Sequence, residues 1–172
     1  DTADVTVTVA PPTINPTQGV EIAVKGFDPN SVLPASGSFT ATSLMAGALE
    51  DGTITITDTQ DATFSDDSLG GETATSSGTV GSINWTDVTT DNEMQWLIED
   101  SLGNQLTVFQ IQVEGPIGRY YWGATDELTQ GATYTVNQRN TNPSAQDGVP
   151  YSDMLGTSTL VEESTTVTVT VE

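Results

Sequence analysis

The chain has 172 residues, with 24 acidic and 3 basic side chains, no His, no Cys and a formal net charge of -21. The scarcity of Lys and Arg argues against binding to nucleic acid or to an anionic membrane. The missing His and Cys exclude Ser-His triads, thiol nucleophiles, structural zinc, haem and iron–sulfur sites. Hydrophobic residues make up 35% of the chain, which allows a folded core. We therefore predict a single folded domain over residues 1–172.

Alternating apolar and polar residues predict strands along most of the chain. The alternation is clearest in residues 4–9, 52–58 and 166–171, where Val or Ile takes one face and Thr takes the other. These residue types are β-branched, which favours strand over helix. Less regular strands are expected at residues 21–25, 37–42, 79–85, 93–99, 105–113, 120–122 and 133–136.

The segments between these strands complete the prediction of fold class. Residues 100–104 are polar and contain Gly, which indicates a hairpin turn. Residues 59–78 and 137–156 read as long loops, and loops of that length are uncommon without a function. Helical turns are expected only at residues 46–50 and 152–155. The spacing of the turns predicts an all-β fold, an antiparallel β-sandwich of jelly-roll or Ig-like type.

An acidic segment within the first long loop is a candidate calcium site. Its five carboxylates are Asp58, Asp61, Asp66, Asp67 and Glu72. Calcium takes about 6–8 oxygen ligands from flexible acidic loops, although this spacing is not that of an EF-hand. A solvated acidic loop without an ion explains the composition equally well. Weaker candidates are the pair Asp147 and Asp153 and the pair Asp126 and Glu127.

Two stretches also carry a family resemblance. Residues 56–67 end in Phe64-Ser65-Asp66-Asp67 and are followed by Gly70-Gly71-Glu72, and residues 99–108 contain Asp100-Ser101-Leu102-Gly103-Asn104 before a strand. Over about residues 50–136 the chain resembles β-rich modules of secreted, calcium-associated surface proteins of marine bacteria. The resemblance implies surface display and calcium association rather than catalysis. The glycine-rich nonapeptide repeats of many such proteins are missing, so their mode of calcium binding does not transfer.

The aromatic residues allow two interpretations. Tyr120-Tyr121-Trp122, flanked by Gly118 and Gly123, could stack on a sugar, as in a carbohydrate-binding module. In the alternative, which we favour, the three residues alternate in and out of a core, because aromatic residues dominate burial in small β-domains.

Two features bear on localisation. The chain begins at Asp1 rather than Met, and we expect that a secretory signal was cleaved. The sequence contains no run of 18 apolar residues, the minimum that would predict a membrane span, so membrane insertion is not expected. Asn84-Trp85-Thr86 is a glycosylation sequon, which makes Asn84 a candidate glycan acceptor.

The two ends of the chain are its most informative feature. Each carries an amphipathic strand, with Val5, Val7 and Val9 at one end and Val167, Val169 and Val171 at the other. Pro11, Pro12 and Pro16 separate the first strand from the body, so residues 1–16 form a candidate donor strand with a proline-rich connector. Such a strand can add to the sheet of a neighbouring copy, and head-to-tail repetition then gives a filament. Alternatively, both strands pair within their own sandwich.

We therefore predict a non-catalytic structural protein that is secreted and lies outside the cell or at its surface. It polymerises with copies of itself into a filament, tube or surface layer by β-strand addition through residues 4–10 or, as the less favoured alternative, 165–171, and calcium stabilises the assembly. Calcium fits this interpretation because copies of like charge repel one another unless cations screen or bridge them. Two alternatives remain open: a carbohydrate-binding or adhesive module, and a virion decoration or fibre protein. Catalysis is the least favoured class. A glycosidase needs a pair of carboxylates, but with 24 acidic residues some pair at a suitable distance occurs in any fold, so its presence does not indicate an enzyme.

Overall fold

A computed structural model describes residues 18–27, 33–41, 48–58, 62–66, 74–129, 131–154 and 160–162. Within these ranges the chain is an all-β, antiparallel sandwich, which confirms the predicted fold class. Its strands are β1 (Gln18–Phe27), β2 (Gly37–Thr40), β3 (Ala48–Asp58), β4 (Thr63–Phe64), β5 (Thr75–Val80), β6 (Ile83–Glu99), β7 (Gln105–Val113), β8 (Arg119–Ala124), β9 (Thr133–Asn140), β10 (Val149–Pro150) and β11 (Leu160–Glu162). A short 3-10 helix, η2 (Tyr151–Asp153), follows β10.

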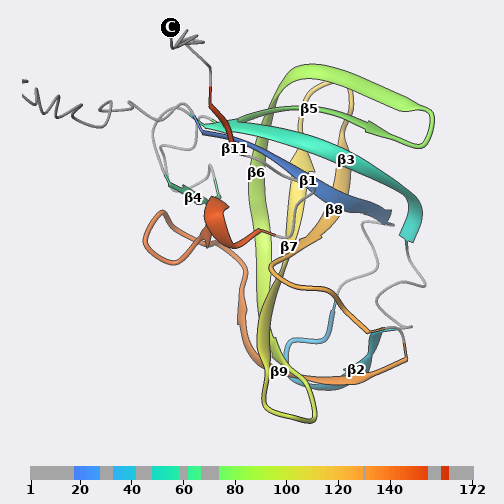
Figure 1. Cartoon of the computed structure of the whole chain (residues 1–172), viewed down its shortest axis with the longest axis vertical. Helices are drawn as coiled ribbons and strands as arrows, with labels where there is room; N and C mark the ends of the chain where they lie inside the picture. Colours follow the sequence, from blue (N-terminus) through green and yellow to red (C-terminus); the bar gives the residue numbers. More distant parts are fainter. Residues whose placement is uncertain are drawn as a thin grey trace, which may run out of the picture.

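Most of the described strands form one hydrogen-bonded sheet that closes on itself through a second pairing of β6. The strands pair in the order β2-β9-β6-β5-β3-β1-β8-β7, and β7 pairs again with β6. In Figure 1, β1, β3 and β5 cross the upper half of the molecule, and β6 and β7 run down to β9 and β2 in the lower half. β4 and β10 form a separate ribbon, and β11 pairs with the start of β1.

Strand β6 is longer than the sequence indicates. Its first part pairs with β5, and its second part pairs with β7 and β9. The expected strand over residues 79–85 is wrong, because a turn at Gly81-Ser82 separates β5 from β6. Gly81 has a φ of 55°, the left-handed conformation that two-residue hairpin turns require. The predicted hairpin of residues 93–99 and 105–113 is confirmed.

Four other expectations need correction or are met only in part. Residues 48–50 belong to β3 and not to a helical turn, because Ala48 pairs with Phe27 of β1. The expected loop over residues 59–78 contains β4 and the start of β5, and the one over 137–156 contains the end of β9, β10 and η2. Two-residue strands such as β4 and β10 are too short to show a period of two. The 3-10 helix η2 lies close to the short helical turn expected at 152–155.

The buried apolar residues form two clusters. The first core consists of Ile54, Ile56, Phe64, Ala74, Val80, Trp85, Phe109, Ile111, Val113, Tyr121, Val149, Tyr151 and Met154. The second core consists of Leu33, Phe39, Ala41, Trp96, Ile98, Leu106, Val108, Trp122, Tyr134 and Val136. We call β4, β10 and η2 together the plug, because they contribute Phe64, Val149 and Tyr151 to the first core.

The sheet formed by β6, β7 and β8 separates the two cores. Successive side chains of a strand point to opposite faces, so Phe109 and Ile111 of β7 face the first core while Leu106 and Val108 face the second. The stretch Val108–Ile111 is buried throughout, since both of its faces are covered. This sheet therefore has a first-core face and a second-core face, and the site described below lies on the former.

Candidate functional site

The described part of the acidic segment holds two of its five candidate ligands. Asp58, at the end of β3, is fully buried, and its Oδ2 accepts a hydrogen bond of 2.9 Å from the Tyr151 hydroxyl. Asp66 follows β4 and is also buried, and its backbone N–H donates to the Pro143 carbonyl at 2.8 Å. Asp61, Asp67 and Glu72 lie outside the described residues. The contacts of Asp58 and Asp66 attach the acidic segment to η2 and to the loop after β9.

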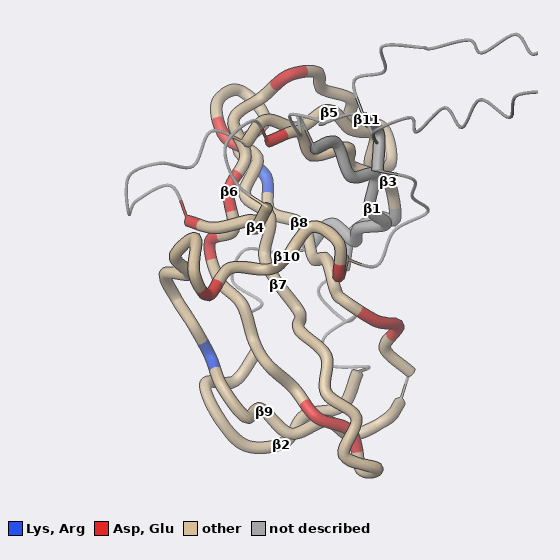
Figure 2. The backbone as a smooth tube through the Cα atoms, turned by 60° about the vertical axis from the view of Figure 1, so that its left-hand side comes forward, with Lys and Arg blue, Asp and Glu red and all other residues tan. Residues whose placement is uncertain are grey.

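Among the residues that the structure describes, no three acidic side chains gather in an arrangement suited to a metal ion. Figure 2 shows acidic positions spread along the described backbone. Asp126 Oδ1 accepts the backbone N–H of Glu127, and Asp153 Oδ1 accepts the Ser152 hydroxyl. Calcium binding at these positions stays a prediction.

Asp147 has a structural role in the loop after β9. Its carboxylate accepts the backbone N–H and the hydroxyl of Ser144 and the side-chain amide of Asn140. These bonds, with that from the Ser144 hydroxyl the largest cause, lower the pKa of the Asp147 carboxyl below its ordinary value. The Asp147 carbonyl in turn accepts the Gln95 side-chain amide at 2.6 Å, which ties the loop to β6.

The Asp-x-x-Gly-Asn stretch that contributed to the family resemblance builds the turn between β6 and β7. Asp100 Oδ1 accepts the backbone N–H groups of Leu102 and Asn104, and Oδ2 accepts the Asn104 side-chain amide. Gly103 has a φ of 87°, which favours glycine. The Asn104 side chain is the main cause that lowers the pKa of the Asp100 carboxyl. The hydrogen bonds of the Asp100 carboxylate are thus made within its own turn.

The Tyr120-Tyr121-Trp122 segment lies in β8 and alternates between the two cores. Tyr121 belongs to the first core, where its ring stacks on Trp85, and Trp122 belongs to the second core beside Trp96. Tyr120 is half-buried, and burial followed by the Glu93 and Asp91 carboxylates raises the pKa of its phenol. The burial of Tyr121 and Trp122 on opposite faces means that the three rings do not form one exposed platform.

The sequon lies in β6 near the β5–β6 turn. Asn84 and Thr86 are exposed, whereas Trp85 between them is buried and donates its indole N–H to the Ser76 hydroxyl at 2.9 Å. Asn84 Oδ1 accepts the Thr79 hydroxyl at 2.7 Å. Glycosylation of this accessible side chain stays a prediction.

The terminal strands lie outside the described residues, so Val5, Val7, Val9, Val167, Val169 and Val171 have no described position. The structure does describe the chain next to them. Gln18 of β1 pairs with Glu162 of β11, and Val20 pairs with Leu160. Figure 1 shows β11 beside the start of β1. The two terminal segments are thus each joined in sequence to a residue of one pair, Gln18 and Glu162.

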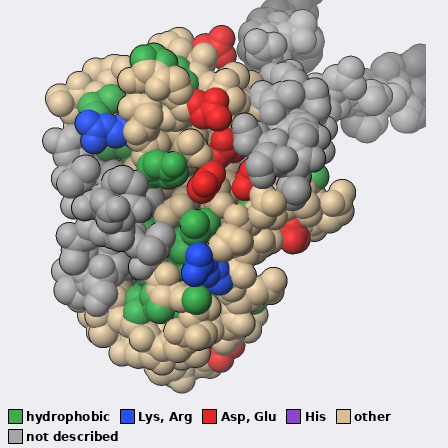
Figure 3. Space-filling view, turned by 180° about the vertical axis from the view of Figure 1, so that it is seen from behind, with side chains coloured by type: hydrophobic (Ala, Val, Ile, Leu, Met, Phe, Trp, Pro, Cys, Tyr) green, Lys and Arg blue, Asp and Glu red, His purple; other side chains and the backbone are tan. Residues whose placement is uncertain are grey.

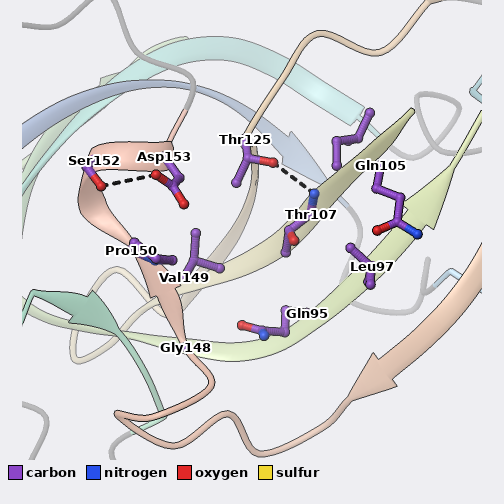
Figure 4. Close-up of a pocket in the computed structure, with 11 residues that line it drawn as sticks. Gln95, Leu97, Gln105, Thr107, Thr125, Gly148, Val149, Pro150, Ser152 and Asp153 are labelled. Carbon is purple, nitrogen blue, oxygen red and sulfur yellow. Dashed lines mark hydrogen bonds between the residues drawn. The ribbon is translucent and has the colours of Figure 1, made fainter. Parts of the chain in front are cut away.

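The structure also forms a groove that the sequence did not reveal. It has a volume of about 520 Å³ and lies between the sheet β6–β7 and the plug. Figure 4 shows Gln95 and Leu97 of β6 and Thr107 of β7 on one side, with Val149 and Asp153 of the plug on the other. These residues come from segments far apart in the chain, and no local motif marks them.

Comparison with models of known protein families, with curated proteins and with solved structures finds no match to this chain. None of the described segments forms a helix that has both the length and the apolar character needed to cross a membrane. The functional argument therefore depends on the geometry of the molecule itself.

Proposed function

We propose that this protein is a non-catalytic, extracellular structural subunit that polymerises by adding the strand of residues 4–10 to the sheet of another copy. The observation that carries the proposal is the antiparallel register of β1 with β11, in which the numbers of paired residues sum to 180. This ladder places the start of β1 between β3 and β11. Among the described strands β11 pairs only with β1, so its other side is an edge of the sheet. Unpaired backbone groups at such an edge are a template for another chain.

The same register disfavours a ladder between the two terminal segments of one chain. If the register continued, Pro16 would lie opposite Ser164, Pro12 opposite Thr168 and Pro11 opposite Val169. Proline has no backbone N–H and is confined to the edges and ends of sheets. A ladder between the two terminal segments of one chain would thus lack backbone N–H donors opposite Thr168 and Val169, where the C-terminal alternation is strongest. Donation of residues 4–10 to another copy avoids this loss.

The charge of the chain supports a role for cations in assembly. Copies with a formal net charge of -21 repel one another at low ionic strength. Figure 3 shows several acidic side chains in a line on the rear face of the molecule. Divalent cations or high salt would reduce this repulsion. Calcium is the ion that we propose, since acidic side chains supply the oxygen ligands it prefers.

The test compares the full chain with matched variants by negative-stain electron microscopy and sedimentation velocity, with calcium and with a chelator. Deleting residues 1–10 or replacing Val5, Val7 and Val9 together by Ser should abolish polymers and leave a folded monomer. Replacing Thr6 and Thr8 by Ser is the control, which should keep the polymers because the Val face is unchanged.

Three results would contradict parts of the proposal. Polymers formed by the chain without residues 1–10 would rule out donation of that strand. Loss of polymer only when Val167, Val169 and Val171 are replaced by Ser would assign donation to the other end. Uniform small particles of the full chain under every condition would rule out self-assembly, and polymers that persist in chelator would remove calcium from the proposal.

A further inference from the structure

The groove begins where the plug ceases to cover the first-core face of the sheet. Along this face the rows of paired residues are Asn92–Ile111, then Gln95–Phe109, then Leu97–Thr107. The side chains of Ile111 and Phe109 are fully buried, whereas Leu97 and Thr107 are only partly buried. The first-core face is therefore fully buried at Phe109 and partly exposed at Thr107, in the next row of paired residues.

The floor and wall of the groove carry hydrogen-bonding groups, of which the Asp153 carboxylate is the charged one among the described lining residues. Thr125 Oγ1 accepts the backbone N–H of Thr107 at 2.8 Å, which leaves the proton of the Thr125 hydroxyl to donate. Gln105 donates its amide N–H to Glu99, and its own carbonyl is an additional acceptor. On the opposite wall the Asp153 carboxylate accepts the Ser152 hydroxyl through Oδ1. Figure 4 shows the Thr107–Thr125 and Ser152–Asp153 contacts on opposite sides of the space.

Protein contacts hold this polar lining in place before any ligand arrives. Gln95 Oε1 accepts the Asn92 side-chain amide at 2.9 Å, while Gln95 Nε2 donates to the Asp147 carbonyl. The Asp147 loop is itself closed by the hydrogen bonds from Ser144. A pre-ordered site avoids part of the entropy cost of binding.

The composition of the groove indicates the class of ligand. None of the described residues that line it is basic, so a phosphate, sulfate or carboxylate would find no counter-charge there. Its polar groups alternate with the apolar side chains of Leu97, Val149 and Pro150. A sugar ring combines hydroxyl groups at its edge with C–H groups on its faces and matches such a lining. The volume of about 520 Å³ lies within the usual range of ligand pockets.

From these observations we infer that the groove between β6–β7 and the plug binds a short neutral saccharide. The hydroxyl groups of Thr107 and Thr125 and the Asp153 carboxylate hydrogen-bond the sugar hydroxyls, and Leu97 and Val149 contact the face of the ring. This site differs from the Tyr120-Tyr121-Trp122 segment, whose second and third rings are buried. The inference does not depend on polymerisation, and its test uses variants that leave residues 1–10 unchanged.

The experiment screens the full chain on an array of neutral and anionic glycans and then titrates the strongest neutral hit by isothermal calorimetry. Ser152→Trp should fill the groove and weaken binding by at least about 10-fold. Thr107→Val removes one hydroxyl and keeps the shape of the side chain, so it should weaken binding by about 3–10-fold. Ser101→Trp, at the exposed β6–β7 turn, and Thr133→Val, at an exposed position of β9, are the matched controls and should bind like the unmodified chain.

Circular dichroism and thermal unfolding of each variant separate loss of binding from loss of fold. Three outcomes would overturn the inference. The first is that no neutral glycan binds on the array or gives a saturation-transfer signal in NMR. The second is a preference for sulfated or sialylated glycans. The third is binding that Thr107→Val and Ser152→Trp leave unchanged while both variants remain folded.

Discussion

The two faces of the sheet β6–β7–β8 are covered in different ways. The second-core face is buried along most of its length, with Trp96, Val108 and Trp122 in one cluster. The first-core face is buried around Ile111 and Phe109 but opens at Thr107. The plug that covers the part around Phe109 and Ile111 consists of two-residue strands and one short helix, and it does not extend over the whole face. Where the plug ends, the surface that forms part of the first core around Phe109 becomes the floor of the groove.

The contacts at the plug explain where this cover ends. Phe64 packs edge-on against Phe109, with ring centroids 6.2 Å apart, and Tyr151 hydrogen-bonds Asp58. The Asn92 side-chain amide donates to the Phe64 carbonyl at 3.2 Å. These contacts hold the plug over one stretch of β7. Beyond it the face carries polar side chains, which solvent or a ligand can hydrogen-bond.

The sharpest test of the comparison uses two residues on the same face of β7. Phe109→Ala removes a fully buried ring from the first core and should lower the free energy of unfolding by about 3–5 kcal/mol. Thr107→Ala, one row further along, should cost less than about 1 kcal/mol, because the side chain there is only partly buried. Urea denaturation of both variants measures the difference. Equal costs would show that the face is covered evenly and that the groove is not open in solution.

A second variant probes how tightly the covered part of the face is packed. Gly123 of β8 pairs with Phe109, and a Cβ at this position would overlap the Phe109 ring. Gly123→Ala should therefore lower the free energy of unfolding by about 1–3 kcal/mol through overpacking. Urea denaturation is again the measurement.

The control for this variant is a double-mutant cycle. Combining Gly123→Ala with Phe109→Leu should cost less than the sum of the two single changes, because the smaller side chain makes room for the added methyl group. Additive costs would show that Gly123 is constrained by something other than the Phe109 ring.

The smallest expected effect concerns the loop that carries the groove wall. The pKa of the Asp147 carboxyl is lowered in the fold, chiefly by the Ser144 hydroxyl, from an ordinary value of 3.8. The ionised carboxylate therefore contributes stability above that ordinary pKa, and the contribution is lost as the pH falls through the lowered value. Asp147→Asn should lower the Tm slightly at about pH 6, and the difference from the unmodified chain should shrink as the pH falls through the lowered pKa of Asp147.

Thermal unfolding as a function of pH, followed by circular dichroism, measures this effect. Ser144→Ala is the companion variant. It removes the largest cause of the lowered pKa, so stability should begin to fall at a higher pH than in the unmodified chain. A constant difference between Asp147→Asn and the unmodified chain at every pH would show that the carboxylate charge does not act on this loop.

Parts of the candidate sites were accessible from the sequence. The turn at Asp100 was recognised because Asp, Gly and Asn in a short polar segment are a local signal. The turn at Gly81-Ser82 next to the exposed Asn84 is not predicted, because residues 79–85 are expected to form one strand. The groove was not predicted, since Gln95, Thr107 and Val149 are brought together only by pairing between distant strands and by the plug. Asp58 and Asp66 were identified as acidic, but their burial and contacts depend on η2 and the loop after β9.

The all-β class follows from the sequence, because a period of two is a local property of each strand, and the antiparallel arrangement follows from the short spacing of the turns. The sequence also determined the acidic surface and the absence of His and Cys chemistry. Three features depend on contacts between distant segments: β6 pairs with β5 at one end and with β7 and β9 at the other, Tyr121 and Trp122 enter different cores, and Phe64 and Val149 cover the first-core face. Single apolar residues in polar segments have no period to detect. What they cover is decided by which strands pair, and those pairings connect residues far apart in the chain.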